Sequence, residues 1–234
     1  MQIKGSVVLV TGANRGIGAE FVRQLKQRGA TKIYAAARNA DSVTVDGVEA
    51  IALDVTDAAQ VAAAAELAGD VQLVINNAGS SSGLTFVDGD LDGIRREFET
   101  NFYGPLALTR AFAPALAANG GGAVINALSA LSWISAPGAT VYAASKAAAW
   151  SLTDGIRLEL AGQGTQVLGM HMGMVDTDMT AGFEIAKISP EAAVTAALDG
   201  LEAGLSEVLV DDTATFVKST LGQAPSERYA VPIG

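Results

Sequence analysis

The sequence contains no cysteine and only one histidine, His171. Without cysteine the chain can form no disulfide framework, no thiolate zinc site and no cysteine nucleophile. A single histidine leaves little with which to build a transition-metal site, so we predict that the protein binds no metal. A reducing compartment fits this composition.

Long hydrophobic runs and positive charge are also scarce. The first apolar run, Val7 to Val10, ends at once in Thr11-Gly12, which is typical of neither a signal peptide nor a membrane span. Lys and Arg number 15 against 25 Asp and Glu, for a formal charge of −10. Such a balance argues against a nucleic-acid partner. We therefore expect a cytoplasmic protein with no nucleic-acid and no membrane partner.

Short apolar runs alternate with helical patterns along the 234 residues. This alternation is typical of βαβ crossovers and of a parallel sheet buried on both faces. No linker or composition shift marks a second domain, so residues 1–234 are predicted to form a single domain. We predict an α/β fold, a Rossmann-type, doubly wound, three-layer sandwich of about seven strands. The expected strands are Val7–Val10, Lys32–Ala37, Glu49–Leu53, Val71–Asn76, Ala123–Ala127, Gln166–Met170 and Glu207–Val210.

A glycine-rich turn follows the first predicted strand. Gly12 permits a tight turn, Gly16 lets the backbone approach a pyrophosphate, and Gly18 allows the next helix to pack closely on the strand. The helix N-terminus then faces the anion. A glycine turn before a helix is also ordinary punctuation, but its position between strand and helix favours a dinucleotide site.

The end of the second predicted strand distinguishes between the two nicotinamide dinucleotides. An acidic residue there would bind the ribose of NAD, but the chain has Ala37 and then Arg38. Together with Arg15 in the glycine loop, Arg38 places two guanidinium groups where a 2′-phosphate would lie. These residues predict NADP(H). The alternative is that Arg38 is a solvated loop charge.

Tyr142 and Lys146 lie one helical turn apart, and an ammonium on the same helix face can hold a phenol ready for proton transfer. The pKa of a free phenol, ~10, lies about three units above neutral pH, so an energy of roughly 4 kcal/mol in favour of the phenolate is needed to bring this pKa to neutral pH. Lys146 is an obvious source of that energy. Ser129 lies thirteen residues before Tyr142, and Asn101 lies further upstream.

From Ser6 to about Thr180 these motifs resemble the short-chain dehydrogenase/reductase family. The resemblance implies that Tyr142 donates the proton in carbonyl reduction, that Ser129 bonds the substrate oxygen, that Lys146 also bonds the nicotinamide ribose, and that Asn101 holds a water in the proton relay. Two departures are Ser132, where the family has glycine, and Met172-Gly173, where it has Pro-Gly. Ser132 and Ser135 are close to Ser129, but the spacing favours Ser129.

The resemblance also assigns the remaining cofactor contacts. Asp54 and Val55 match the pair that contacts the adenine, although Asp54 could equally cap the following helix. Thr177 matches the residue that meets the carboxamide. The other predicted cofactor-binding residues are Asn14, Ile17, Asn77, Ala78, Gly79, Gly173 and Val175, beside Tyr142 and Lys146 themselves.

For the substrate we predict an apolar pocket lined by Trp133, Met172 and Phe183, which could equally be core residues. The segment from Thr180 to Pro190 is short for a lid, which suggests an open site with broad acceptance. His171 is predicted to be structural, with no catalytic role.

The sequence therefore predicts an NADPH-dependent carbonyl reductase or alcohol dehydrogenase. The alternatives are an NAD-dependent alcohol dehydrogenase, a catalytically silent NADP-sensing regulator and a sugar-nucleotide epimerase, for which the chain is short. We also expect a homodimer or homotetramer. The apolar positions Trp150, Leu152, Ile156 and Leu160 form its interface or cover the sheet.

Overall fold

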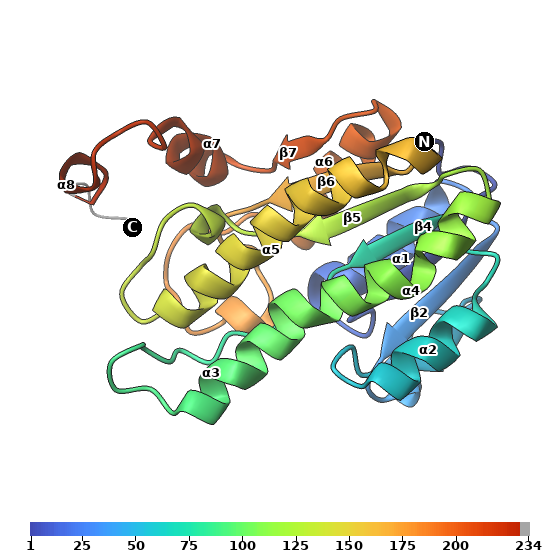
Figure 1. Ribbon diagram of the computed structural model, residues 1–234, viewed down its shortest axis with the longest axis horizontal. Coiled ribbons are helices and arrows are strands. Elements are labelled where there is room, and N and C mark those ends of the chain that lie inside the picture. Colours follow the sequence, from blue (N-terminus) through green and yellow to red (C-terminus); the bar gives the residue numbers. More distant parts are fainter. Residues whose placement is uncertain (230–234) are drawn as a thin grey trace.

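A single parallel sheet of seven strands organises the computed structural model in Figure 1, which describes residues 1–229. The spatial order is β3-β2-β1-β4-β5-β6-β7, and every neighbouring pair is parallel. The seven predicted strands are all observed, and the predicted fold class is confirmed. Their bounds are β1 (Val7–Thr11), β2 (Lys32–Ala37), β3 (Glu49–Ala52), β4 (Leu73–Asn76), β5 (Ala123–Ala127), β6 (Gln166–His171) and β7 (Glu207–Leu209).

Helices cover both faces of this sheet, so the fold has three layers (Figure 1). In one hydrophobic cluster α1 and α6 contribute the helical side chains, and in another α2, α4 and α5 do so. The helices are α1 (Gly16–Gln27), α2 (Ala58–Leu67), α3 (Leu91–Phe98), α4 (Gly104–Ala118), α5 (Thr140–Glu159), α6 (Pro190–Glu202), α7 (Asp212–Ser219) and α8 (Pro225–Arg228). In the described residues no helix has the length and hydropathy needed to cross a membrane, and no group of His, Asp and Glu could hold a metal ion.

Strand β1 illustrates how the sequence specifies the layers. Successive side chains of a strand point to opposite faces. Val8 and Val10 accordingly enter the cluster under α1 and α6, whereas Leu9 enters the cluster under α2 and α4. All three side chains are fully buried, and each such burial contributes about 1.5–3 kcal/mol. A strand buried on both faces is therefore apolar throughout.

The strand order places the functional loops. Because all strands run in the same direction, their carboxyl ends meet at one edge of the sheet. The chain moves outward from β1 through β2 to β3 and then returns to β4 on the other side of β1. Ligands of open α/β sheets bind at such a reversal, outside the carboxyl ends of the strands. The loops after β1 and β4 therefore flank the expected binding crevice.

The four apolar positions predicted for an interface lie on α5 or, for Leu160, directly after it, and most of them cover the sheet. Ile156 and Leu160 are buried in the cluster under α2 and α4, and Leu152 packs against it. Trp150 packs instead on a separate cluster beside α7, where its ring meets Trp133 edge-on at 6.0 Å. Packing on the core thus accounts for these positions.

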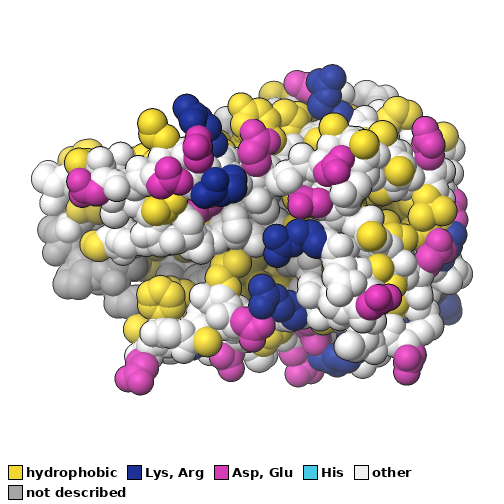
Figure 2. All heavy atoms as spheres, turned by 90° about the horizontal axis from the view of Figure 1, so that it is seen from below, with side chains coloured by type: hydrophobic (Ala, Val, Ile, Leu, Met, Phe, Trp, Pro, Cys, Tyr) yellow, Lys and Arg dark blue, Asp and Glu magenta, His cyan; other side chains and the backbone are white. Residues whose placement is uncertain are grey.

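The face drawn in Figure 2 carries basic side chains interspersed with acidic ones. A surface that binds a phosphate backbone would instead gather its Lys and Arg in a stripe or patch. No such stripe or patch is seen on this face.

Candidate active site

The glycine loop adopts a backbone that only glycine accommodates easily. Gly12 and Gly16 have φ angles of +64° and +52°, in the left-handed region. A Cβ on Gly12 would lie 3.1 Å from the Cα of Ala78, so the loops after β1 and β4 are in close contact. Asn77 secures this contact by donating its side-chain amide to the carbonyl of Thr11 at 2.9 Å. The predicted residues Asn77 and Ala78 are thus brought against the glycine loop.

Helix α1 begins directly over this loop. A Cβ on Gly18 would lie 2.0 Å from the carbonyl oxygen of Gly12, so only glycine permits this packing. The helix has no side-chain cap and no acidic residue in its first turn. Its first N–H groups therefore have no side-chain acceptor, and the helix dipole adds positive potential. The pyrophosphate of a dinucleotide fits this cradle.

Two arginines are predicted to bind a 2′-phosphate. Arg38 is exposed directly after β2, and Ala37 before it brings no carboxylate. Arg15 is also exposed, and its guanidinium pairs at 2.9 Å with the carboxylate of Asp178, which lies in the loop after β6. An exposed pair of this kind contributes at most about 1 kcal/mol, so Arg15 can exchange its partner for a phosphate. The residues present fit NADP(H).

Other predicted cofactor residues take defined places. Asp54 accepts hydrogen bonds from the backbone and side chain of Thr56, whereas Asp57 caps α2. The capping alternative for Asp54 is therefore wrong, because Asp57 occupies that position. Val55 is buried and would be 2.8 Å from a Cβ on Gly104, so it is also a packing residue.

The loop after β6 approaches the glycine loop. The methyl group of Thr177 would lie 3.1 Å from a Cβ on Gly16, which joins the two predicted cofactor segments. Val175 is buried and forms an isolated parallel β-bridge with Ile188. Gly173 donates its N–H to Asp211 at 2.9 Å, so its backbone is held from the α7 side. The loop in which the family's proline is missing thus contacts the start of α7.

Tyr142 and Lys146 lie on the first turns of α5, at the carboxyl edge of the sheet. Lys146 is 6% exposed and donates its ammonium to the carbonyl of Ala127, at the end of β5, at 2.8 Å. Its Nζ lies 5.7 Å from the centre of the Tyr142 ring. The helical spacing therefore brings the two side chains together as the sequence predicts.

The protonation states differ from the sequence-based expectation. Burial raises the pKa of Tyr142 to about 12, opposed by a hydrogen bond with Ser129. Burial lowers the pKa of Lys146 to about 8, opposed by the charge of Glu97. We expected Lys146 to lower the pKa of the phenol, but burial raises it instead. Tyr142 consequently keeps its proton at neutral pH.

Ser129 begins a 3₁₀ turn, Ala130–Ser132, that follows β5. Its hydroxyl accepts a hydrogen bond from the N–H of Leu131 at 3.1 Å, which leaves the hydroxyl proton free to be donated elsewhere. The Ser132 hydroxyl instead accepts from the backbone of Ser129 at 3.2 Å, and Ser135 lies beyond the turn. Ser129 is therefore the serine that faces Tyr142, and Ser132 supports its turn.

Asn101 lies in a π-helical turn, Glu99–Tyr103, between α3 and α4. Such turns are rare and often mark functional sites. The Asn101 amide donates to the carbonyl of Ser80 at 2.8 Å and to the hydroxyl of Ser145 at 2.9 Å. Because Ser145 directly precedes Lys146, Asn101 links the loop after β4 to α5. Gly79 lies against this link, since its Cβ would be 3.3 Å from Asn101 and 3.7 Å from Lys146.

His171 supports the turn that begins at Ser129, a contact that the sequence did not reveal. Its Nδ1 lies 3.2 Å from the carbonyl oxygen of Ser129, and its ring stacks on Trp133 at 3.9 Å. Burial lowers the pKa of His171 to about 4, so the ring is neutral at physiological pH. Because a carbonyl oxygen only accepts, Nδ1 carries the proton and donates it to Ser129.

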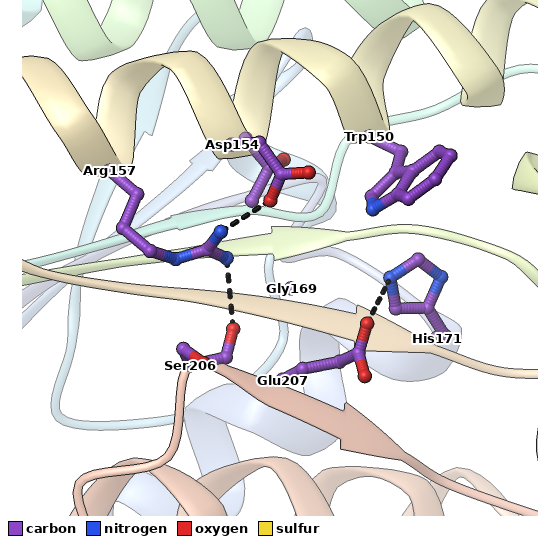
Figure 3. A pocket seen from close by; sticks show the side chains of 8 residues that line it. Trp150, Asp154, Arg157, Gly169, His171, Ser206 and Glu207 are labelled. Carbon is purple, nitrogen blue, oxygen red and sulfur yellow. Dashed lines mark hydrogen bonds and ion pairs between the residues drawn. The ribbon is translucent and has the colours of Figure 1, made fainter.

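The other side of His171 faces a polar cavity of about 140 Å³ between α5, β6 and β7 (Figure 3). Glu207 lies 3.7 Å from His171 Nε2, and Arg157 joins Asp154 to the carbonyl of Ser206. Most polar groups of these lining residues thus pair with one another. The residues that line the cavity lie behind the Ser129 turn and contact it through His171.

The predicted substrate residues separate into two groups. Trp133 is 6% exposed, and its ring is held between His171, Trp150 and the cation of Lys218. Met172 is buried in the core under α1 and α6. Both therefore take the core role that the sequence left open. Phe183 is 53% exposed in the loop before α6, where it can still meet a substrate.

The comparisons with known proteins agree with this geometry. The short chain dehydrogenase family model matches residues 6–187. A short chain dehydrogenase from Burkholderia cenocepacia J2315, solved in complex with NADP, is 40% identical with a TM-score of 0.94 and covers 99% of this chain and 100% of its own. This bound NADP agrees with the NADP(H) prediction.

Two curated relatives extend the comparison. The short-chain dehydrogenase ptmH of Penicillium ochrochloron is 36% identical over 180 residues, which are 73% of this chain and 66% of the relative. The chain thus spans just under two thirds of that protein's length. The ketoacyl reductase HetN of Nostoc sp. is 31% identical over 228 residues, 89% of this chain and 79% of its own. With its glycine loop, its Tyr142–Lys146 pair and Ser129 assembled at one edge of the sheet, the chain belongs to the short-chain dehydrogenase family.

Proposed function

We propose that the protein uses NADPH to reduce ketones or aldehydes to alcohols, in a reversible reaction with Tyr142 as proton donor. The observation that carries this proposal is Tyr142 itself, whose ring centre lies 5.7 Å from the Nζ of the buried Lys146. It lies on the same edge of the sheet as a loop that fits a dinucleotide. The name of the Nostoc relative, a ketoacyl reductase, supports carbonyl reduction.

Each polar residue has a defined task in this reaction. Ser129 donates its free hydroxyl proton to the carbonyl oxygen of the substrate, and Tyr142 transfers a proton to that oxygen as the alcohol forms. Bound NADPH supplies the hydride that reaches the carbonyl carbon. Lys146 stabilises the phenolate that remains, and Asn101 holds the backbone beside Lys146 through Ser80 and Ser145.

The cofactor preference follows from the two arginines. Arg15 and Arg38 offer guanidinium groups to a 2′-phosphate, whereas the end of β2 has Ala37 and then Arg38, with no carboxylate at either position to bind a ribose hydroxyl pair. We therefore propose NADP(H) in preference to NAD(H). The homo-oligomeric state and cytoplasmic location remain predictions.

Substrate class follows from the exposed side chains near the crevice. Met179, Phe183 and Ile185 are apolar and exposed in the segment between β6 and α6. Phe86 and Val87 are exposed in the loop that leads to α3. We therefore expect apolar carbonyl compounds, with bulky aryl ketones turned over better than small hydroxylated ones.

The test measures NADPH oxidation with a panel of aryl, alkyl and hydroxylated carbonyl compounds. Tyr142→Phe keeps the ring but removes the proton donor, so turnover should fall by about 10²–10⁴ while NADPH still binds. If wild-type protein binds NADPH but reduces none of the panel, the alternative of an NADP-sensing regulator is favoured. If Tyr142→Phe keeps more than about a tenth of wild-type turnover, the proton comes from another group.

A further inference from the structure

Glu97 is a buried carboxylate next to the catalytic groups, and none of the roles described above includes it. It lies near the end of α3, one turn before Asn101, and is 2% exposed. Its Oε2 accepts a hydrogen bond from the backbone of Ser82 at 2.8 Å and another from the Ser82 hydroxyl. Its Oε1 is buried without a hydrogen-bond partner among the described residues. Burying a carboxylate in this way is costly, so a compensating function is expected.

Glu97 and Asn101 act on the same segment of the chain. Asn101 holds Ser80 through two hydrogen bonds, and Glu97 holds Ser82 two residues later. One helical turn separates the two side chains, so they bind alternate residues of the loop after β4. This double attachment fixes the loop beside Gly79, which lies against Lys146.

The charge of Glu97 also acts on the reacting pair. It raises the pKa of both Lys146 and Tyr142. Elsewhere on α3, Arg95 and Arg96 are exposed and pair with Asp92 and Asp90.

The neighbouring elements offer no competing charge. Glu99 and Tyr103 of the π-helical turn and Glu159 of α5 are exposed, while Asp154 and Arg157 of α5 pair with each other. His171 of β6 is neutral at physiological pH because burial lowers its pKa. Glu97 is therefore the charge that faces the catalytic pair from within the fold.

We propose, resting on the carbonyl reductase function above, that Glu97 is a positioning residue whose buried negative charge keeps Lys146 an ammonium and whose bonds to Ser82 hold the loop after β4 in place. Without this counter-charge, desolvation lowers the pKa of Lys146 further, and its proton is lost at lower pH. A neutral Lys146 no longer stabilises the phenolate that Tyr142 becomes. Glu97 thereby sets the alkaline limit of the reaction.

The first test compares pH profiles of kcat for NADPH-dependent reduction. Glu97→Gln removes the charge but keeps an oxygen for Ser82, and should move the alkaline limb to lower pH by about one unit. Glu97→Asp keeps the charge, so its alkaline limb should lie close to that of the wild-type protein. Ser82→Ala removes one hydrogen bond only and should leave the limb in place, as should Glu99→Gln, which removes an exposed carboxylate two residues away. An unchanged limb in Glu97→Gln, or an equal shift in Ser82→Ala or Glu99→Gln, overturns the proposal.

A second test does not depend on turnover. Glu97→Gln is made in the wild-type and in the Lys146→Met background, and urea unfolding of all four proteins forms a double-mutant cycle. The two changes should be non-additive near neutral pH, and the coupling should fade once Lys146 loses its proton. Additive effects overturn the proposal. Non-additive effects in a protein that reduces no carbonyl compound would instead show that the charge pairing holds and the proposed function fails.

Discussion

Replacing Lys146 by methionine should remove activity and yet stabilise the fold. Lys146 is buried, and its pKa falls from 10.5 to about 8, so the folded protein penalises the ammonium by about 3 kcal/mol. Methionine has a similar length and carries no charge. Losing the bond to the Ala127 carbonyl costs about 1–2 kcal/mol, which leaves a net gain of about 1–2 kcal/mol. For a chain of this length, each kcal/mol raises Tm by about 2–4 °C.

The pH dependence identifies the cause of this gain. The folded pKa lies below the unfolded one, so the penalty is fully present below about pH 8 and disappears as pH rises toward 10.5. Over that window wild-type stability should rise, because the unfolded chain still binds the proton that the folded protein has lost. Lys146→Met lacks this rise, so its advantage should shrink and then reverse.

Urea unfolding at neutral and alkaline pH provides the measurement. Lys4→Met is the matched control, because Lys4 is exposed and its replacement should change stability by less than about 0.5 kcal/mol. The reasoning is refuted if Lys146→Met is less stable than the wild-type protein at neutral pH. It is also refuted if the difference between the two proteins is the same at every pH.

Three further outcomes are expected. Gly18→Ala places a Cβ 2.0 Å from the carbonyl of Gly12, so α1 must shift and NADPH affinity should fall at least tenfold in a fluorescence titration. Combining Ala37→Asp with Arg38→Ala should reverse the preference for NADPH over NADH, as measured by kcat/KM; a wild-type preference for NADH would contradict the assignment. Because the folded pKa of His171 is depressed to about 4, wild-type stability should fall as pH drops from about 6.5 to 4, and His171→Phe should show a smaller fall in acid unfolding.

Features that depend on local spacing could be predicted from the sequence. Strand β1 is a continuous apolar run, and successive side chains of a strand point to opposite faces, so the run indicates a sheet covered on both sides. Leu9 and its neighbours are accordingly buried in different clusters. Gly12 and Gly18 flank a turn whose geometry excludes other residues. Tyr142 and Lys146 share a helix face because four residues make about one turn. In each case a few consecutive residues carry the information.

What only the tertiary structure decided concerns contacts between distant segments. Spacing favoured Ser129 over Ser132, but the hydrogen bonds by which the two serines build one turn could not be predicted from it. His171 meets Ser129, and Glu97 meets Ser82, through pairings that no spacing rule contains. The proton affinity of the catalytic pair likewise could not be predicted, because desolvation depends on how many atoms from distant segments exclude water. The sequence determined the chemical groups and their local geometry, whereas packing determined their electrostatic state.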